Sequence, residues 1–308
     1  KDNEIEYWYD VEKKIFPCAK ELEKLSELND KSFLKGFRCF THEYVQDFKQ
    51  NEEIIRKIIL RKCIQQKKYR EDYNYLVELN KFEKEFGDYI KEINEKVFTE
   101  DVNGFRDNKF IDKIHKVFQE DKNETNIVIN FNYTTVIKNE INKFKNIQKY
   151  PTAENIRSIK EVINIHGDYK NPIFGIDNQN IDESMNVFTK TYRILSSDTI
   201  ESFTLPSNEL LETIYFFGHS LSEADYSYFQ SMFDYYSIYD SKIRLIFLYS
   251  DHDGKEKSRQ ENRVVKLIND YGKTLENKDK GKNLLHKLLL ENRIKIYEIE
   301  KAKEILEK

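Results

Sequence analysis

The sequence predicts an α/β fold, with a Rossmann-like, mostly parallel sheet, flanking helices and a large helical region in the N-terminal part. Residues 1 to about 122 carry apolar side chains at three- and four-residue steps, whereas the rest alternates short β-rich runs with helical stretches. Strands that alternate with helices are typical of parallel sheets joined by right-handed crossovers. We therefore expect a helical region at 1–122 and an α/β core at 123–308.

The helical region is predicted from its periodicity. Its longest apolar stripe runs from Tyr73 to Val97 and forms one face of an amphipathic helix. Similar patterns begin at Tyr7 and Ile54, and a further helix is expected at 105–118. Ordinary packing explains these stripes without a cofactor, and the region is our candidate for a sensing or assembly surface.

Five short runs rich in β-branched and aromatic residues are the expected strands of the core. They are 126–132, 162–166, 214–218, 243–249 and 294–299. The third and fourth runs are almost continuously apolar, which is typical of strands buried on both faces of a parallel sheet.

Helices are expected between these strands, at 134–145, 224–236 and 256–271. Residues 168–207 hold few regular signals and are expected to form loops or a lid. The polar segment from Asn277 to Asn283 is expected to be a hairpin or loop tip.

Composition excludes several classes of function. With 51 Lys and Arg against 55 Asp and Glu, the net charge is −4, so sequence-independent nucleic-acid binding is disfavoured. The 20 Tyr and 21 Phe supply a large core. Three scattered cysteines form neither a disulfide framework nor a zinc module, which favours a reducing cytoplasm and no bound metal. No apolar run approaches ~20 residues, so no membrane span is expected.

The candidate site follows from the ends of the first two strands, because open α/β sheets bind ligands at the carboxyl ends of their strands. Asn132 falls at the first strand–helix junction, where an Asn also serves as a helix N-cap. His166, followed by Gly167, closes the second strand. An imidazole there is either an ordinary loop His or a general base, since His titrates near neutral pH.

The third strand adds a polar turn. Gly218 allows close approach of a ligand, and Ser220 supplies a hydroxyl at the start of the next helix. Asp225 either caps that helix or bonds a ribose hydroxyl.

Taken together, these motifs resemble the AbiH-type family of bacteriophage abortive-infection proteins. The resemblance rests on the early Tyr7-Trp8 helix, on Phe131-Asn132-Tyr133-Thr134 and Ile165-His166-Gly167, and on Phe174-Gly175-Ile176-Asp177 and Gly218-His219-Ser220-Leu221 through Asp225. It implies an anti-phage effector that is held inactive until infection. It also implies a nucleotide ligand and a phage trigger or partner protein, and it is compatible with a homo-oligomer.

The motif order is also similar, more distantly, to the sirtuin-like superfamily of NAD-binding Rossmann folds. That similarity implies hydrolysis of NAD at the nicotinamide–ribose bond, with Asn132 and His166 as catalytic residues. NAD is then the substrate or ligand. The implied nucleotide-binding residues are Tyr133, Thr134, Gly167, Gly175, Asp177, Gly218, His219, Ser220 and Asp225.

The sequence departs from these families at three points. Sirtuin deacylases carry a four-cysteine zinc module that three cysteines cannot build, and Thr134 stands where they usually have Asp. The Gly-Asn-Gly-Phe-Asp loop of the AbiH type is absent from the 308 residues. Either that loop is lost or it precedes Lys1, and the lack of an initiator Met favours the second.

Two alternative functions stay open. A non-catalytic nucleotide sensor would use the same cleft without cleaving its ligand. A metal-dependent nuclease would use the acidic cluster of Asp251, Asp253 and Glu256, beside His252. A polar turn at a strand end explains that cluster more simply.

Overall fold

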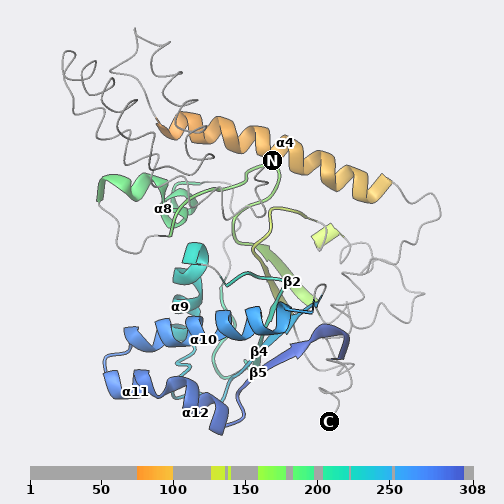
Figure 1. Ribbon diagram of the computed structural model, residues 1–308. Helices are drawn as coiled ribbons and strands as arrows, with labels where there is room; N and C mark the ends of the chain where they lie inside the picture. The colour runs from red at the N-terminus through yellow and green to blue at the C-terminus, as the bar shows by residue number, and fades with distance from the viewer. Residues whose placement is uncertain are drawn as a thin grey trace, which may run out of the picture. The chain divides into compact units, whose positions relative to one another are not determined.

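The computed structural model describes residues 75–99, 126–135, 138–139, 159–177, 183–197, 204–221, 223–251 and 254–301 (Figure 1). The chain divides into two compact units, one of residues 1–85 and 173–198 and the other of residues 86–172 and 199–308. The expected boundary near residue 122 lies outside the described residues and stays a prediction, as do the helices expected near Tyr7, near Ile54 and at 105–118.

The long amphipathic helix is confirmed as α4 (Tyr75–Thr99). Its buried positions recur at three- and four-residue steps, but they include polar groups. They are Glu83, Phe86, Gly87, Ile90 and Asn94. The predicted stripe is therefore only partly right: Phe82 and Tyr89, which it included, are 38% and 49% exposed.

The first unit contains a 3-10 helix, η1 (Glu183–Phe188), and a helix, α8 (Lys190–Leu195). The sequence predicts loops or a lid at residues 168–207, and the predicted loop structure is wrong at these positions, which are helical. Thr189 explains the start of α8, because its hydroxyl accepts a hydrogen bond from the Tyr192 N–H at 3.1 Å.

A buried ion pair organises the described part of this unit. The Glu83 carboxylate accepts hydrogen bonds from the Phe174 N–H at 2.8 Å and from the Arg193 guanidinium, which also donates to Asn80 Oδ1 at 3.0 Å. Burial raises the pKa of Glu83, and the charge of Arg193 opposes that rise. Such a pair is costly to break from one side, since the remaining charge would stay buried.

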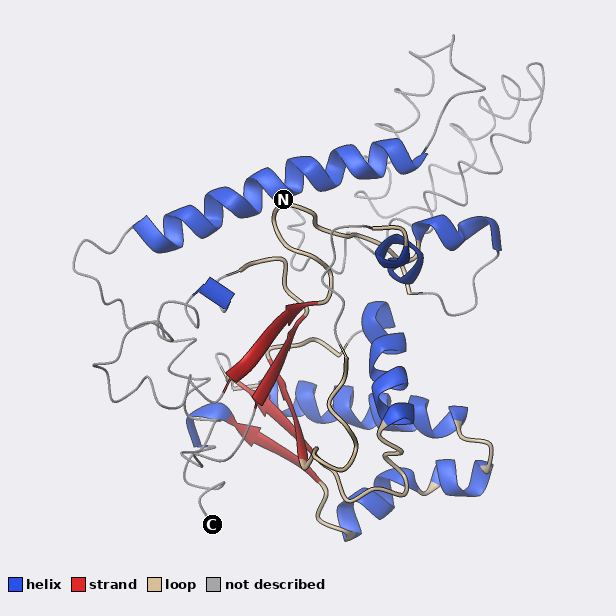
Figure 2. Ribbon diagram, turned by 180° about the vertical axis from the view of Figure 1, so that it is seen from behind, coloured by secondary structure: helices blue, strands red, loops and turns tan. Residues whose placement is uncertain are grey.

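The described part of the second unit carries five strands, each paired in parallel with its neighbours (Figure 2). β1 (Asn126–Asn130) pairs with β2 (Ile159–Asn164). β3 (Thr213–Phe217), β4 (Arg244–Tyr249) and β5 (Ile294–Glu298) form a three-stranded sheet in that order. All five expected strands are present, which confirms the mixed α/β class. Hydrogen bonds group the described strands into sheets of two and three instead of one continuous sheet.

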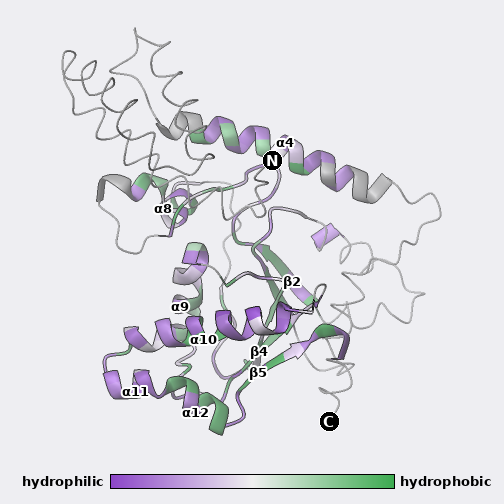
Figure 3. Ribbon diagram, viewed as in Figure 1, coloured by the Kyte–Doolittle hydropathy of each residue, from purple (hydrophilic) through white to green (hydrophobic). Residues whose placement is uncertain are grey.

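The helices of this unit cover one face of the three-stranded sheet (Figure 1). They are α9 (Tyr226–Tyr235), α10 (Glu256–Thr274), α11 (Lys278–Lys282) and α12 (Leu284–Leu290). Most residues along α10 and α11 are hydrophilic (Figure 3). None of the described helices has the length and apolar content needed to cross a bilayer.

Alternate side chains of β4 enter different cores, as expected for a strand buried on both faces. Leu245 and Phe247 belong to the core beneath the helices, whereas Ile246 and Leu248 pack on the opposite face. Phe247 stacks on its register partner Phe216 with ring centroids 4.4 Å apart. These contacts fix the register of the sheet and so the positions of its strand ends.

The segment from Asn277 to Asn283 is a helix, not the hairpin or loop tip that its polarity suggested. The Asn277 side chain caps α11 by accepting hydrogen bonds from the N–H groups of Asp279 and Lys280, at 3.1 and 3.0 Å. Gly281 lies against Gly272 of α10. A Cβ added at Gly281 would be 2.0 Å from the Gly272 carbonyl oxygen. The backbones meet where no side chain fits.

Replacing either of these glycines with alanine should destabilise the fold. Helix propensity alone would make Ala more stable than Gly by about 1 kcal/mol. The close backbone contact reverses the sign, so Gly272→Ala and Gly281→Ala should each cost about 1–3 kcal/mol in urea unfolding. The control is Lys257→Ala, an exposed position on α10, which should stay within about 0.5 kcal/mol of the wild-type stability. Stabilised glycine variants would contradict the packing described.

Two buried tyrosines make the second unit sensitive to alkaline pH. Burial, followed by the nearby Tyr235, raises the pKa of Tyr236 to about 12. Burial and the hydrogen bond to Asp234 raise the pKa of Tyr271 as well. Because an unfolded tyrosine ionises near pH ~10, the stabilising contribution is complete below that pH and is lost as the pH rises toward the folded value.

Removing one phenol should therefore flatten the alkaline loss of stability. Between pH 10 and 12, Tyr236→Phe and Tyr271→Phe should each reduce the slope of the unfolding free energy by about 1.4 kcal/mol per pH unit. Urea unfolding at a series of pH values measures this slope. Curves that run parallel to wild type across this range would show that the two phenols do not carry the effect.

Candidate functional site

The carboxyl ends of β1 and β2 bring the two predicted catalytic segments together. Asn130 lies opposite Asn164 in the parallel register, so Asn132 and His166 each follow two residues beyond a matched pair. The rings of Phe131 and Tyr133, on either side of Asn132, contact the His166 imidazole at centroid distances of 5.4 and 6.1 Å. The loop after β1 therefore lies against His166, whose side chain is only 3% exposed, while Asn132 is exposed.

Asn130 organises this edge, although the sequence analysis did not single it out. Its Nδ2 donates to Asn164 Oδ1 at 3.0 Å and to the Thr134 carbonyl at 3.1 Å. Its Oδ1 accepts from the Asn132 backbone N–H at 3.1 Å and from Asn132 Nδ2 at 3.3 Å. Both halves of the amide are thus used, which sets the orientation of its partners. Within the described part of the chain, no donor hydrogen-bonds to Asn132 Oδ1.

Asp225 joins two histidines from different strand ends. Its Oδ1 lies 3.3 Å from His166 Nε2, after β2, and its Oδ2 lies 3.2 Å from His219 Nε2, after β3. The Asp225 side chain is 10% exposed and makes no capping hydrogen bond to α9. The capping alternative is therefore wrong for this side chain, which makes a hydrogen-bond contact with His219 and lies at ion-pair distance from His166.

An aromatic shell surrounds the cluster of His166, His219 and Asp225, which we call the His-Asp-His cluster. Phe131 contacts both imidazoles and also the rings of Tyr228 and Phe229 on α9, at 5.9 and 5.5 Å. Charges and hydrogen bonds act more strongly in such surroundings than in water. Tyr228 lies in the helix expected at 224–236, but no motif in the sequence singles it out.

The glycines of the site play different roles. Gly167 has a φ of 75°, and a Cβ there would be 2.0 Å from the Asn171 carbonyl oxygen, so the turn beside His166 needs glycine. Gly218 has a φ of 65°, and none of the described residues places an atom within 4 Å of a Cβ added there. Ser220 is partly exposed beside it. The β3 end therefore has open space against its backbone, as close approach of a ligand would require.

Two predicted binding residues lie in the first unit. Gly175 packs against backbone, since an added Cβ would be 2.6 Å from the Lys190 nitrogen and 2.8 Å from the Phe188 oxygen. This contact explains the glycine without a ligand. Asp177 is partly buried nearby. Their part in nucleotide binding stays a prediction, and so does that of Tyr133 and Thr134.

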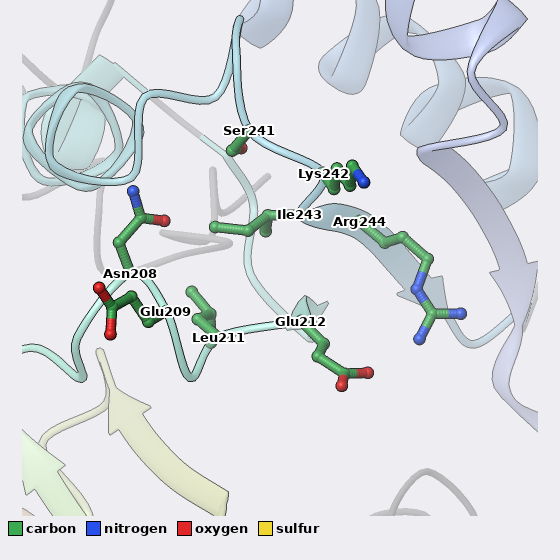
Figure 4. A pocket seen from close by; sticks show the side chains of 8 residues that line it. All are labelled: Asn208, Glu209, Leu211, Glu212, Ser241, Lys242, Ile243 and Arg244. Atoms are coloured by element: carbon green, nitrogen blue, oxygen red, sulfur yellow. The ribbon is translucent and has the colours of Figure 1, made fainter.

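A shallow hollow of about 540 Å³ lies at the other ends of the strands (Figure 4). It is lined around the starts of β3 and β4 by Asn208, Glu209, Glu212, Ser241, Lys242 and Arg244, among others. Ligands of open α/β sheets bind at the carboxyl ends. The hollow is thus separate from the His-Asp-His cluster.

The acidic cluster after β4 is used for local structure where the chain is described. Asp251 Oδ1 accepts hydrogen bonds from the N–H groups of Gly254 and Glu256, at 2.8 and 3.4 Å. Glu256 pairs with Arg263 and Arg259, at 2.6 and 3.2 Å. No group of three metal-ligating side chains is found within the described part of the chain, which leaves out His252 and Asp253. A polar turn explains these contacts.

Comparison with known proteins identifies the chain. The model of the family described as bacteriophage abortive infection AbiH matches residues 1–249, a span that contains Asn132 and the whole His-Asp-His cluster. No curated protein and no solved structure matches the sequence. With the match covering most of the 308 residues, the chain belongs to the AbiH family of bacteriophage abortive-infection proteins.

Proposed function

We propose that this protein serves abortive infection by hydrolysing NAD at the nicotinamide–ribose bond. Family membership supports the role in abortive infection. The observation that carries the chemistry is the Asp225 carboxylate, 3.3 Å from His166 Nε2, beside the loop that holds Asn132. Polar groups at the carboxyl ends of parallel strands are the setting in which Rossmann-like folds, including sirtuin-like ones, hold dinucleotides.

His166 would act as the general base. His166 Nε2 lies at ion-pair distance from Asp225 but without the geometry of a hydrogen bond. A hydrogen on Nε2 would be attracted by the facing carboxylate, which would leave the lone pair of the neutral imidazole on Nδ1 as the atom that takes a proton. Asn132 Oδ1 would accept a hydrogen bond from the attacking water or from a ribose hydroxyl.

The reaction consumes NAD and water and yields nicotinamide, ADP-ribose and a proton. Nicotinamide leaves as a neutral molecule with the electrons of the glycosidic bond, and water forms the new bond to the ribose. His166 receives the proton of that water. A positioned base of this kind contributes roughly 10²–10⁴-fold to the rate.

The rest of the site would hold the nucleotide. Gly218 offers close approach to backbone, and Ser220 offers a hydroxyl beside it. Tyr133 and Thr134 come from the loop over His166. Because His166 is 3% exposed, the ribose enters only if this loop moves. Such closure suits an effector whose activity is withheld until infection.

One observation favours a second function, that of a non-catalytic nucleotide sensor. The same burial of His166 would keep a substrate away from the base while the nucleotide rests on the open edge at Gly218. Calorimetry separates the two functions: a sensor binds NAD or ADP-ribose with a defined stoichiometry and releases no nicotinamide, whether or not the protein is activated.

The NAD proposal predicts the effects of two substitutions. His166→Gln should lower nicotinamide release by about 10²–10⁴-fold, because it removes the base. Asn132→Ala should lower it by about 10-fold or more, at ~1.4 kcal/mol for the lost hydrogen bond. Release is measured by chromatography with purified protein, and cellular NAD is followed after phage infection so that the natural trigger is present.

His286→Gln is the matched control, because His286 lies on α12, outside the His-Asp-His cluster. It should leave both readouts at the wild-type level. Circular dichroism confirms that each variant is folded. Equal NAD loss in wild type, His166→Gln and Asn132→Ala would remove both residues from the mechanism. NAD that stays constant throughout a productive abortive response would overturn the proposal.

A further inference from the structure

We propose that His219 is a positioning residue, which holds Asp225 toward His166 and does not contact the nucleotide through its ring nitrogens. The proposal rests on the proposed function for its purpose, because it refines which residues serve the base. It differs from the expectation that His219 binds the cofactor. The geometry of three groups carries it: the two imidazoles and the backbone at Leu221.

The backbone determines the tautomer of His219. The Leu221 N–H donates to His219 Nδ1 at 2.9 Å, so that nitrogen presents a lone pair. Leu221 has a φ of 52°, a left-handed conformation uncommon for leucine, and this turn follows Gly218 at a φ of 65°. A hydrogen on Nδ1 would face the hydrogen of the Leu221 amide. The hydrogen of neutral His219 therefore sits on Nε2.

That hydrogen is directed at Asp225. His219 Nε2 lies 3.2 Å from Asp225 Oδ2, so His219 donates there. Both of its ring nitrogens are then occupied by protein groups, and none is left for a nucleotide. The second carboxylate oxygen, Oδ1, is 3.3 Å from His166 Nε2. Holding one oxygen of a carboxylate fixes the direction of the other, since the two are joined to one carbon.

The surroundings favour this chain of contacts. Within the described part of the chain, the titratable side chains that contact His166 include Asp225, Tyr133 and Tyr228. Tyrosine is ordinarily a neutral side chain near pH 7. Phe131 covers both imidazoles, at 5.4 and 4.7 Å. Asp225 is thus the anion that these contacts place against His166, and His219 is the donor that orients it.

Nitrogen NMR of the full chain, labelled on histidine, tests the tautomers directly. At pH 8, His219 should show hydrogen on Nε2 and a bare Nδ1, and His166 should likewise show hydrogen on Nε2. Single His→Gln substitutions, with His286→Gln as the reference, assign the signals. A hydrogen on His219 Nδ1 would overturn the proposal. This NMR measurement needs no substrate, so it tests the position of the His219 hydrogen even if the protein does not cleave NAD.

A pair of variants tests whether His219 acts through Asp225. Gln places an amide donor where His219 Nε2 lies, whereas Leu fills the space without a donor. We expect His166 to keep its single Nε2–H tautomer in His219→Gln and to lose it in His219→Leu, where Nδ1–H signals should appear. A merely structural role would leave His166 alike in both variants, and that result would overturn the proposal. If His219→Leu does not fold, the tautomers measured in the wild-type protein test the proposal instead.

Discussion

The contact of one carboxylate with two imidazoles is the constraint on which the candidate site depends. Asp225 opens α9, and its two oxygens meet His166 from the end of β2 and His219 from the end of β3. These strands belong to different hydrogen-bonded sheets, so no backbone ladder among the described strands connects their ends. Removing the carboxylate would take away the hydrogen-bond partner of His219 Nε2 inside the aromatic shell. Loss of one member of a buried polar network is costly for that reason.

Around this contact lie aromatic rings and the Asn130 amide, whose nitrogen and oxygen are both engaged in hydrogen bonds. Asn130 ties the β1 end to Asn164 of β2 and to the backbone of its own loop. Phe131, the next residue, turns its ring toward His166, His219 and α9. At this junction, Asn130 thus makes the polar contacts, and the adjacent Phe131 makes the apolar contacts. Under the proposed function, this junction must open before a ribose can reach His166, so the activity would depend on movement of residues 131–134.

Much of the core could be predicted from sequence because its signals are local. Apolar runs identify β3 and β4, and helical periodicity identifies α4 and α10. The helix α11 escaped prediction because its Lys- and Gly-rich sequence resembles a turn, and only Asn277 hinted at a cap. In the site, His166 and Asp225 could be named as candidates. Their pairing could not, because an Asp before a helix equally predicts a cap, and because Asn130 and Asn164 meet only through strand register.

The family match has a practical consequence for experiments on truncated chains. It ends at residue 249, the last residue of β4, yet the face of that strand that holds Leu245 and Phe247 is covered by side chains from further along, among them Ile268, Tyr271 and Leu288. A protein cut after Tyr249 would present a bare aromatic surface and an open edge along β4, where β5 normally pairs. Unpaired apolar edges invite strand-to-strand association. The matched span therefore ends before the elements that complete this core, and residues 250–308 include the helices that cover the sheet and protect it from association with other chains.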